Sequence, residues 1–117
     1  MKIRNYKWKL FTANLNPVKG SEQRGSRPVL IISDETFNQT MPVITILPIT
    51  SLKDGRNVYP NEVLLPKGVA GLARDSIVLT HQIRTISKDR LQSILGQIEE
   101  AGLRDKINNS LRVHLNL

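Results

Sequence analysis

The side chain with the clearest chemistry is Arg27, which stands between a polar loop and a buried strand. Residues 20–26 are polar and contain two glycines, whereas residues 29–32 form a continuous aliphatic run that predicts a strand buried on both faces. Pro28 disfavours helix at Arg27 and places the arginine in extended backbone at the mouth of that strand. A permanently charged, planar guanidinium on a rigid base suits phosphate recognition. The alternative is a loop arginine that is paired with Glu22 or solvated.

Two further polar residues stand at predicted strand ends. Thr50 follows an aliphatic strand and Gln82 lies near another, so these residues and Arg27 could converge on one rim. Metal chemistry has little support, because the chain has no cysteine, and its histidines are His81 and His114 alone. No cluster of carboxylates suggests a two-metal site either.

The elements that must position these residues are mostly short strands. In the last of these strands the pleat places Gln82, Arg84 and Ile86 on one side. A polar turn is expected at 34–40, an exposed basic loop at 53–57 and a turn region at 67–75. Strands are expected at 7–15, 28–33, 42–49, 61–65, 76–79 and 81–86.

Two helices are expected after the strands. Ser87 is the predicted N-cap of a short helix that ends at Gly96 and has Leu91, Ile94 and Leu95 on one face. The terminal helix carries an apolar stripe with a spacing of four residues, formed by Leu103, Ile107, Leu111 and Leu115. Strands followed by helices predict a mainly β, α+β fold, a small barrel or strongly bent sheet with helical additions.

Length and charge limit the classes of protein to which the chain can belong. A chain of 117 residues predicts one domain over 1–117. The net charge is +7, and residues 1–27 carry seven Lys and Arg against Glu22 alone. This asymmetry suggests a polyanionic partner, although a basic protein whose charge only prevents aggregation is the alternative. The chain shows no signal peptide and no apolar run of about 18 residues, so no membrane association and a cytoplasmic location are expected.

Three blocks of the chain carry a resemblance to a known family. They are NPVKGSEQRGSRPVLIIS at 16–33, ILPITS at 46–51 and ARDSIVLTHQIRTISKDRL at 73–91. In this order they resemble the MazF/PemK family, the toxins of type II toxin–antitoxin systems that act as endoribonucleases (mRNA interferases). The resemblance covers nearly the whole chain.

The resemblance implies a fold, an activity and partners. The fold would be an SH3-like small β-barrel of the CcdB/MazF/PemK type that forms a homodimer. The activity would be sequence-specific cleavage of single-stranded RNA without a metal or other cofactor, giving a 2′,3′-cyclic phosphate and a 5′-hydroxyl. The cognate antitoxin, similar to MazE, would cover the RNA groove with an acidic C-terminal tail.

The resemblance also assigns residues. Arg27 and Thr50 match the family's catalytic pair. The positions that would bind RNA are Ser21, Glu22, Gln23, Arg24 and Gln82. The chain departs from its relatives at residues 4–8, and His81 stands where relatives often have an acidic residue. A partly exposed strand histidine or a proton-transfer group are the two interpretations of His81.

The chemistry of such cleavage fits the residues present. A permanently charged guanidinium is a poor base, so Arg27 would mainly stabilise charge on the phosphate, with proton donation to the leaving 5′-oxygen as a second role. Thr50 would orient the phosphate by a hydroxyl hydrogen bond. The nucleophile would be the substrate's own 2′-hydroxyl, whose proton would pass to Glu22 or through a phosphate oxygen. Two other classes stay open. One is a CcdB-like gyrase poison, which the lack of a C-terminal tryptophan disfavours; the other is an inactive RNA- or antitoxin-binding module.

Overall fold

A computed structural model describes residues 3–117, which form seven strands and two α-helices. The mainly β composition followed by a terminal helix confirms the predicted class. Short 3-10 helices connect several of the elements: η1 (Val69–Gly71), η2 (Thr80–Gln82) and η3 (Lys88–Arg90). The strands are β1 (Lys9–Asn14), β2 (Ser26–Ile31), β3 (Val43–Ser51), β4 (Val63–Leu65), β5 (Ser76–Val78), β6 (Arg84–Ser87) and β7 (Leu91–Gln97), and the α-helices are α1 (Glu35–Thr40) and α2 (Ala101–Leu115).

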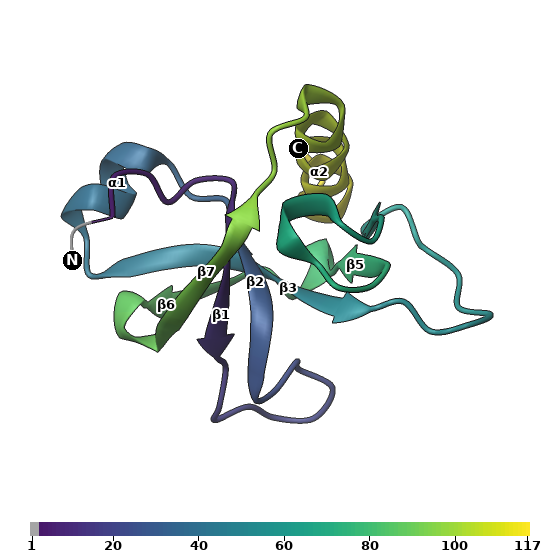
Figure 1. Ribbon diagram of the computed structural model, residues 1–117, viewed down its shortest axis with the longest axis horizontal. Helices are drawn as coiled ribbons and strands as arrows, with labels where there is room; N and C mark the ends of the chain where they lie inside the picture. The colour runs from purple at the N-terminus through teal and green to yellow at the C-terminus, as the bar shows by residue number, and fades with distance from the viewer. Residues whose placement is uncertain (1–2) are drawn as a thin grey trace.

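The strand β3 connects the two ends of the sheet. The strand order is β4-β5-β3-β2-β1-β7, with β6 paired to β3 as well. Along its length β3 pairs with β6 at 43–46, with β2 at 46–48 and with β5 at 49–51, always antiparallel. One strand with three successive partners makes the sheet curl, and in Figure 1 the β1–β2 connection projects below the sheet while α2 stands above it.

The strand β2 lies inside this curled sheet, as its aliphatic sequence predicted. Val29, Leu30 and Ile31 each have an exposed fraction of 0%. Val29 and Ile31 pack into one apolar cluster with residues of β1, β3 and β6, whereas Leu30 packs into a second cluster beneath α2. Burying each such side chain stabilises the fold by about 1.5–3 kcal/mol, so β2 is held rigidly from both faces.

The helix predicted after Ser87 is wrong. The Ser87 hydroxyl does cap the backbone of Asp89 at 3.3 Å, but it caps only the short 3-10 helix η3. The chain then extends into β7, which pairs with β1 and leaves Ile94 52% exposed. The spacing of Leu91, Ile94 and Leu95 fits one face of a helix. The segment forms a strand instead because it pairs with the otherwise unpaired edge of β1, and this long-range pairing outweighs the local pattern.

Two shorter segments also differ from the prediction. Residues 34–40, expected as a turn, contain the helix α1, whose first turn is capped by the Asp34 carboxylate at 3.0 Å from the Thr36 nitrogen. The strand expected at 81–86 begins only at Arg84, because η2 occupies residues 80–82. The predicted pleat with Gln82 and Arg84 on one side is therefore wrong.

The terminal helix α2 covers the second cluster as predicted. Leu103 and Ile107 are buried and Leu111 is partly buried against the same cluster. Leu115 is 45% exposed, so the apolar stripe leaves the core in the last turn. Neither α2 nor any other helix within residues 3–117 is long and apolar enough to cross a membrane.

A close approach of two backbones predicts the effect of one substitution. A Cβ at Gly96 in β7 would lie 2.5 Å from the carbonyl carbon and oxygen of Ala70 in η1. We expect Gly96→Ala to lower the free energy of unfolding by about 1–3 kcal/mol, as overpacking does, measured by urea denaturation. In the control Gly102→Ala the nearest atom is a flexible Glu100 oxygen at 3.2 Å. Alanine in this first turn of α2 should stabilise by up to about 1 kcal/mol, and similar losses in both variants would contradict the argument.

Candidate RNA-cleavage site

Arg27 and Thr50 come together because of the register between β2 and β3. Val29 pairs with Pro48, and extending this register by two residues sets Arg27 opposite Thr50. Side chains alternate along a strand, so these four residues belong to one face of the two strands. The strand β2 begins at Ser26, so Arg27 lies within the strand rather than at its mouth. The pairing partner of Arg27 on the other side is in β1, which makes its backbone position rigid.

Arg27 and Thr50 line one open hollow of about 240 Å³. The lining also includes residues 72–74, which follow η1, and Arg74 is among them. Sequence reasoning missed Arg74 as a second cation of this hollow. Its position just before β5 was the available signal, because β5 pairs with β3 at Thr50 and Ile77.

The guanidinium of Arg27 keeps most of its donors free. Its Nε donates to the carbonyl of Arg24 at 3.0 Å, while neither Nη group has a partner within residues 3–117. The alternative of an ion pair with Glu22 is wrong, because Glu22 accepts a hydrogen bond from the Lys19 nitrogen at 2.8 Å instead. The free Nη groups leave Arg27 able to form a bidentate contact with a phosphate.

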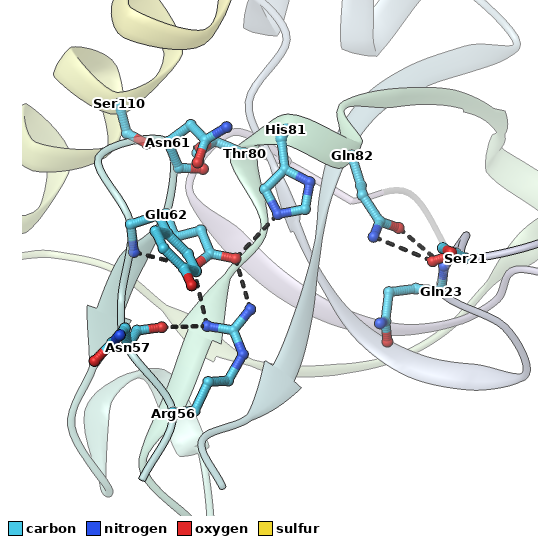
Figure 2. Close-up of polar contacts among 11 residues, drawn as sticks. Ser21, Gln23, Arg56, Asn57, Asn61, Glu62, Thr80, His81, Gln82 and Ser110 are labelled. Carbon is cyan, nitrogen blue, oxygen red and sulfur yellow. Dashed lines mark hydrogen bonds and ion pairs between the residues drawn. The ribbon is translucent and has the colours of Figure 1, made fainter.

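The loop between β1 and β2 is held by Gln82, which Figure 2 shows reaching toward it from η2. The Oε1 of Gln82 accepts from the Gln23 nitrogen at 2.9 Å, and its Nε2 donates to the Ser21 carbonyl at 3.4 Å. Both polar atoms of this amide therefore fix the backbone of the loop. Gln82 therefore lies beside the other predicted RNA-binding residues, and its amide supports the backbone of the loop that carries them.

Two arginines brace the base of the same loop. Arg84 Nη1 donates to the Leu15 carbonyl at 2.9 Å. Arg90 Nη1 donates to the Asn14 carbonyl at 3.2 Å and also to the Asn16 carbonyl. Each such charge-assisted hydrogen bond contributes roughly 1.5–3 kcal/mol. The loop is therefore positioned by the segment between η2 and β7 as well as by its own turns.

A second hollow of about 290 Å³ adjoins the first along β3. Pro48 lines the second hollow and Thr50 the first, and two residues of a strand span about 7 Å. Ser21 and Arg24 are exposed on the loop and line neither hollow. The predicted residues thus gather on one side of the molecule but in two adjoining hollows. The second is lined by Glu22, Gln23, Pro48, His81, Gln82, Ile83 and Arg84.

The carboxylate of Glu62, with its side chain 1% exposed, links the 53–57 loop to His81 (Figure 2). Arg56 donates to its two oxygens at 2.9 and 2.7 Å, the Tyr59 nitrogen donates at 3.1 Å, and His81 Nε2 lies 3.0 Å from Oε2. The hydrogen bonds from Arg56 lower the pKa of Glu62 to about 2, against the opposing effect of burial. Arg56 is therefore engaged with Glu62, whereas the rest of the predicted basic loop, residues 53–55 and 57, is exposed as expected.

The two histidines have different surroundings. His81 lies in η2 on the edge of the second hollow, so it is not the strand histidine that the sequence predicted. His114 lies in the last turn of α2, with its ring edge-on to that of His81 at a centroid distance of 6.4 Å. Within residues 3–117 no three His, Cys, Asp or Glu side chains are grouped so that they could hold a metal ion.

Several known proteins are similar to this chain in sequence and in fold. Residues 6–115 match the family described as PemK-like, MazF-like toxin of type II toxin–antitoxin system. The chain is 35% identical over 108 residues to Endoribonuclease MazF of Staphylococcus saprophyticus, covering 92% of this chain and 88% of that protein. Its structure is similar to that of MazF from Deinococcus radiodurans, with a TM-score of 0.82, 26% identity and 100% of both chains covered. The MazE–MazF structure from the same organism has a TM-score of 0.72 and 25% identity, covering 100% of this chain and 99% of that one. The expected fold of the MazF/PemK type is confirmed.

Acidification is expected to weaken the fold through Glu62. Its folded-state pKa of about 2 lies below the ordinary 4.5, so the ionised form stabilises the fold at neutral pH, and this contribution is lost as the pH falls from 4.5 to about 2. Glu62→Gln should lower the free energy of unfolding at pH 7 by about 3 kcal/mol and flatten its decline in acid, measured by urea denaturation at each pH. The exposed control Glu99→Gln should change it by less than about 0.5 kcal/mol. An equally steep acid decline in Glu62→Gln would refute this role.

Proposed function

Because the chain belongs to the PemK-like, MazF-like toxins of type II toxin–antitoxin systems, we propose that it is an endoribonuclease that cleaves single-stranded RNA at short sequences. The observation that carries the proposal is the placement of Arg27 opposite Thr50 in one hollow, with both Nη groups of the arginine unpaired within residues 3–117. A rigid, free guanidinium beside a hydroxyl is suited to hold a phosphate and to stabilise the charge that builds on it.

The reaction is a transesterification within the RNA. The 2′-oxygen loses its proton and forms a bond to phosphorus while the bond to the 5′-oxygen breaks. The 5′-oxygen takes up a proton, from the Arg27 guanidinium or from water, which leaves a 2′,3′-cyclic phosphate and a 5′-hydroxyl. Arg27 stabilises the negative charge on the phosphate oxygens and Thr50 orients one of them by a hydrogen bond. The nucleophile is already tethered next to the phosphorus, so no covalent intermediate with the protein and no metal-bound water is required.

Proton transfer from the 2′-hydroxyl is assigned to Glu22. It is the only carboxylate in residues 1–27. Its Oε1 accepts from the Lys19 nitrogen, which leaves Oε2 able to accept a proton. Glu22 lines the second hollow rather than the first, so the RNA backbone would run along β3 from Thr50 toward Pro48 to bring the carboxylate to the ribose.

The predicted RNA-binding residues divide into two roles. Ser21 and Arg24 are exposed on the loop and are available to the RNA backbone. Gln23 and Glu22 line the second hollow and contact the nucleotide next to the scissile phosphate. Gln82 affects RNA binding indirectly, because its amide holds the backbone of the loop that carries the other RNA-binding residues.

The partners follow from the family and from the charge. Residues 1–27 carry a balance of +6, which suits both RNA and an acidic antitoxin tail. We propose that residues 1–117 form one toxin domain, which acts as a homodimer in the cytoplasm, where its RNA substrate is. A MazE-like antitoxin neutralises the toxin by covering the surface that binds RNA.

Arg27→Ala should abolish cleavage and leave the fold intact. The loss of one transition-state donor costs roughly 100-fold or more in rate, whereas a partly exposed arginine without an ion-pair partner contributes little to stability. The rate is measured on a single-stranded RNA oligonucleotide, with thermal unfolding as the test of the fold. In the control Lys53→Ala an exposed cation outside both hollows is removed, and the rate should stay near that of the wild type. Near-normal activity of Arg27→Ala would remove it from the catalytic site.

A substrate with one altered atom tests the nucleophile. Replacing the 2′-hydroxyl at the cleavage site by hydrogen should stop cleavage but leave binding almost unchanged, because the phosphates and bases that the protein contacts remain. Chelation with EDTA should leave the rate unaltered. Normal cleavage of the deoxy-substituted site, or loss of activity in EDTA, would indicate a hydrolytic nuclease instead.

A further inference from the structure

Arg74 is a cation of the first hollow, the one that Arg27 and Thr50 line. Its guanidinium forms no hydrogen bond and no ion pair within residues 3–117; only its backbone carbonyl is engaged, by the Ser76 hydroxyl at 2.8 Å. The neighbouring Asp75 accepts from the Lys67 nitrogen at 2.8 Å instead. The side chain of Arg74 is exposed and free to bind a ligand.

The charges around the first hollow favour an anion. Arg27 and Arg74 are its two charged residues, and none of the described residues that line it is acidic. Two guanidinium groups on one hollow repel each other, and an anion bound between them turns that repulsion into attraction to a common partner. The hollow is therefore built for a phosphate that both arginines contact, and the part played by Arg74 depends on which side of the phosphate it lies.

Arg74 lies on the side of Thr50 that faces away from the second hollow. Just beyond Thr50, the Leu52 nitrogen donates to the Asp75 carbonyl at 2.9 Å, so the segment that carries Arg74 runs beside the end of β3. Pro48, which lines the second hollow, comes two residues before Thr50 on the same strand. Along β3 the order is therefore the second hollow, then Thr50, then Arg74.

This order places Arg74 near the leaving group of the proposed reaction. Glu22, to which the proton of the 2′-hydroxyl is assigned, lines the second hollow, so the attacking 2′-oxygen lies on that side of the phosphorus. In an in-line displacement the leaving oxygen lies opposite the attacking oxygen. The 5′-oxygen therefore lies away from the second hollow, toward the end of the first hollow that Arg74 lines.

We propose that Arg74 is a further catalytic residue, which donates a hydrogen bond to the leaving 5′-oxygen and stabilises the negative charge that builds on it. The electron pair of the breaking phosphorus–oxygen bond goes to the 5′-oxygen, and the guanidinium of Arg74 stabilises that pair until the oxygen takes up its proton. Arg27 and Thr50 bind the oxygens of the phosphate that are not broken off. The inference rests on the proposed endoribonuclease activity and adds a residue to its mechanism.

The protein side of the test removes the charge of Arg74. On a single-stranded RNA oligonucleotide that contains a mapped cleavage site, Arg74→Gln should lower kcat by roughly 10–100-fold with little change in KM, because the contact forms as charge develops on the leaving oxygen. Arg74→Lys keeps a cation without the planar fork and should recover part of the rate. Lys67→Gln is the matched control, since it removes an exposed cation of the same segment that lines neither hollow, and its rate should stay near that of the wild type.

The substrate side replaces the leaving 5′-oxygen at the same site by sulfur. A thiol has a pKa of about 8.5, far below that of an alcohol, so the sulfur leaves without the help of a cation. Arg74→Gln should therefore cleave the sulfur substrate at close to the wild-type rate. Arg27→Ala should stay slow on it, because the charge on the other phosphate oxygens still lacks its partner. The ratio of the two substrates is measured on one preparation, so it does not depend on how much of a variant is folded.

The outcomes separate the two proposals. If the wild type cleaves RNA and Arg74→Gln is equally fast on the oxygen substrate, or equally impaired on both substrates, the inference is overturned and the endoribonuclease proposal stands. A raised KM with an unchanged kcat has the same meaning, because it indicates a contact with a neighbouring phosphate. An equal loss in Lys67→Gln also overturns the inference, since the effect would then be one of net charge. If the wild type cleaves no RNA, the proposed function is overturned and the role of Arg74 with it.

Discussion

The geometry of the site depends on β3, a nine-residue strand shared by three partners. Its backbone hydrogen bonds to β6, β2 and β5 fix the strands that border the two hollows. Thr50 and Arg27 line one hollow just beyond the end of the β2–β3 pairing, and Pro48 brings the second hollow next to the first. A strand buried on both sides tolerates little displacement, which gives Arg27 a rigid base.

The arginines of this basic chain differ in what they are free to do. Arg56 is engaged with Glu62, and Arg84 and Arg90 donate to loop carbonyls. Arg27 donates only its Nε, so its two Nη groups are available for a phosphate. The net charge attracts a polyanion over a distance. Which arginine can then bind it depends on which N–H groups are not already hydrogen-bonded within the protein. Arg84 and Arg90 contribute by preorganising the loop beside Arg27.

The network of Arg56, Glu62 and His81 joins fold stability to the second hollow. The same hydrogen bonds that lower the pKa of Glu62 also hold the ring of His81 in place. A carboxylate is costly to bury, and the hydrogen bonds from Arg56, the Tyr59 nitrogen and His81 offset that cost.

The sequence by itself determined the buried strand around Val29, the placement of Arg27 before a proline and the apolar stripe of α2, because each is a local pattern of residue types. Strand β7 and the pairing of Glu62 with His81 were decided only by the tertiary structure. The spacing around Ile94 fits a helix as well as a strand, and the choice came from the unpaired edge of β1, some eighty residues away in sequence. Contacts between distant segments leave no periodicity in the chain, so no local pattern could reveal them.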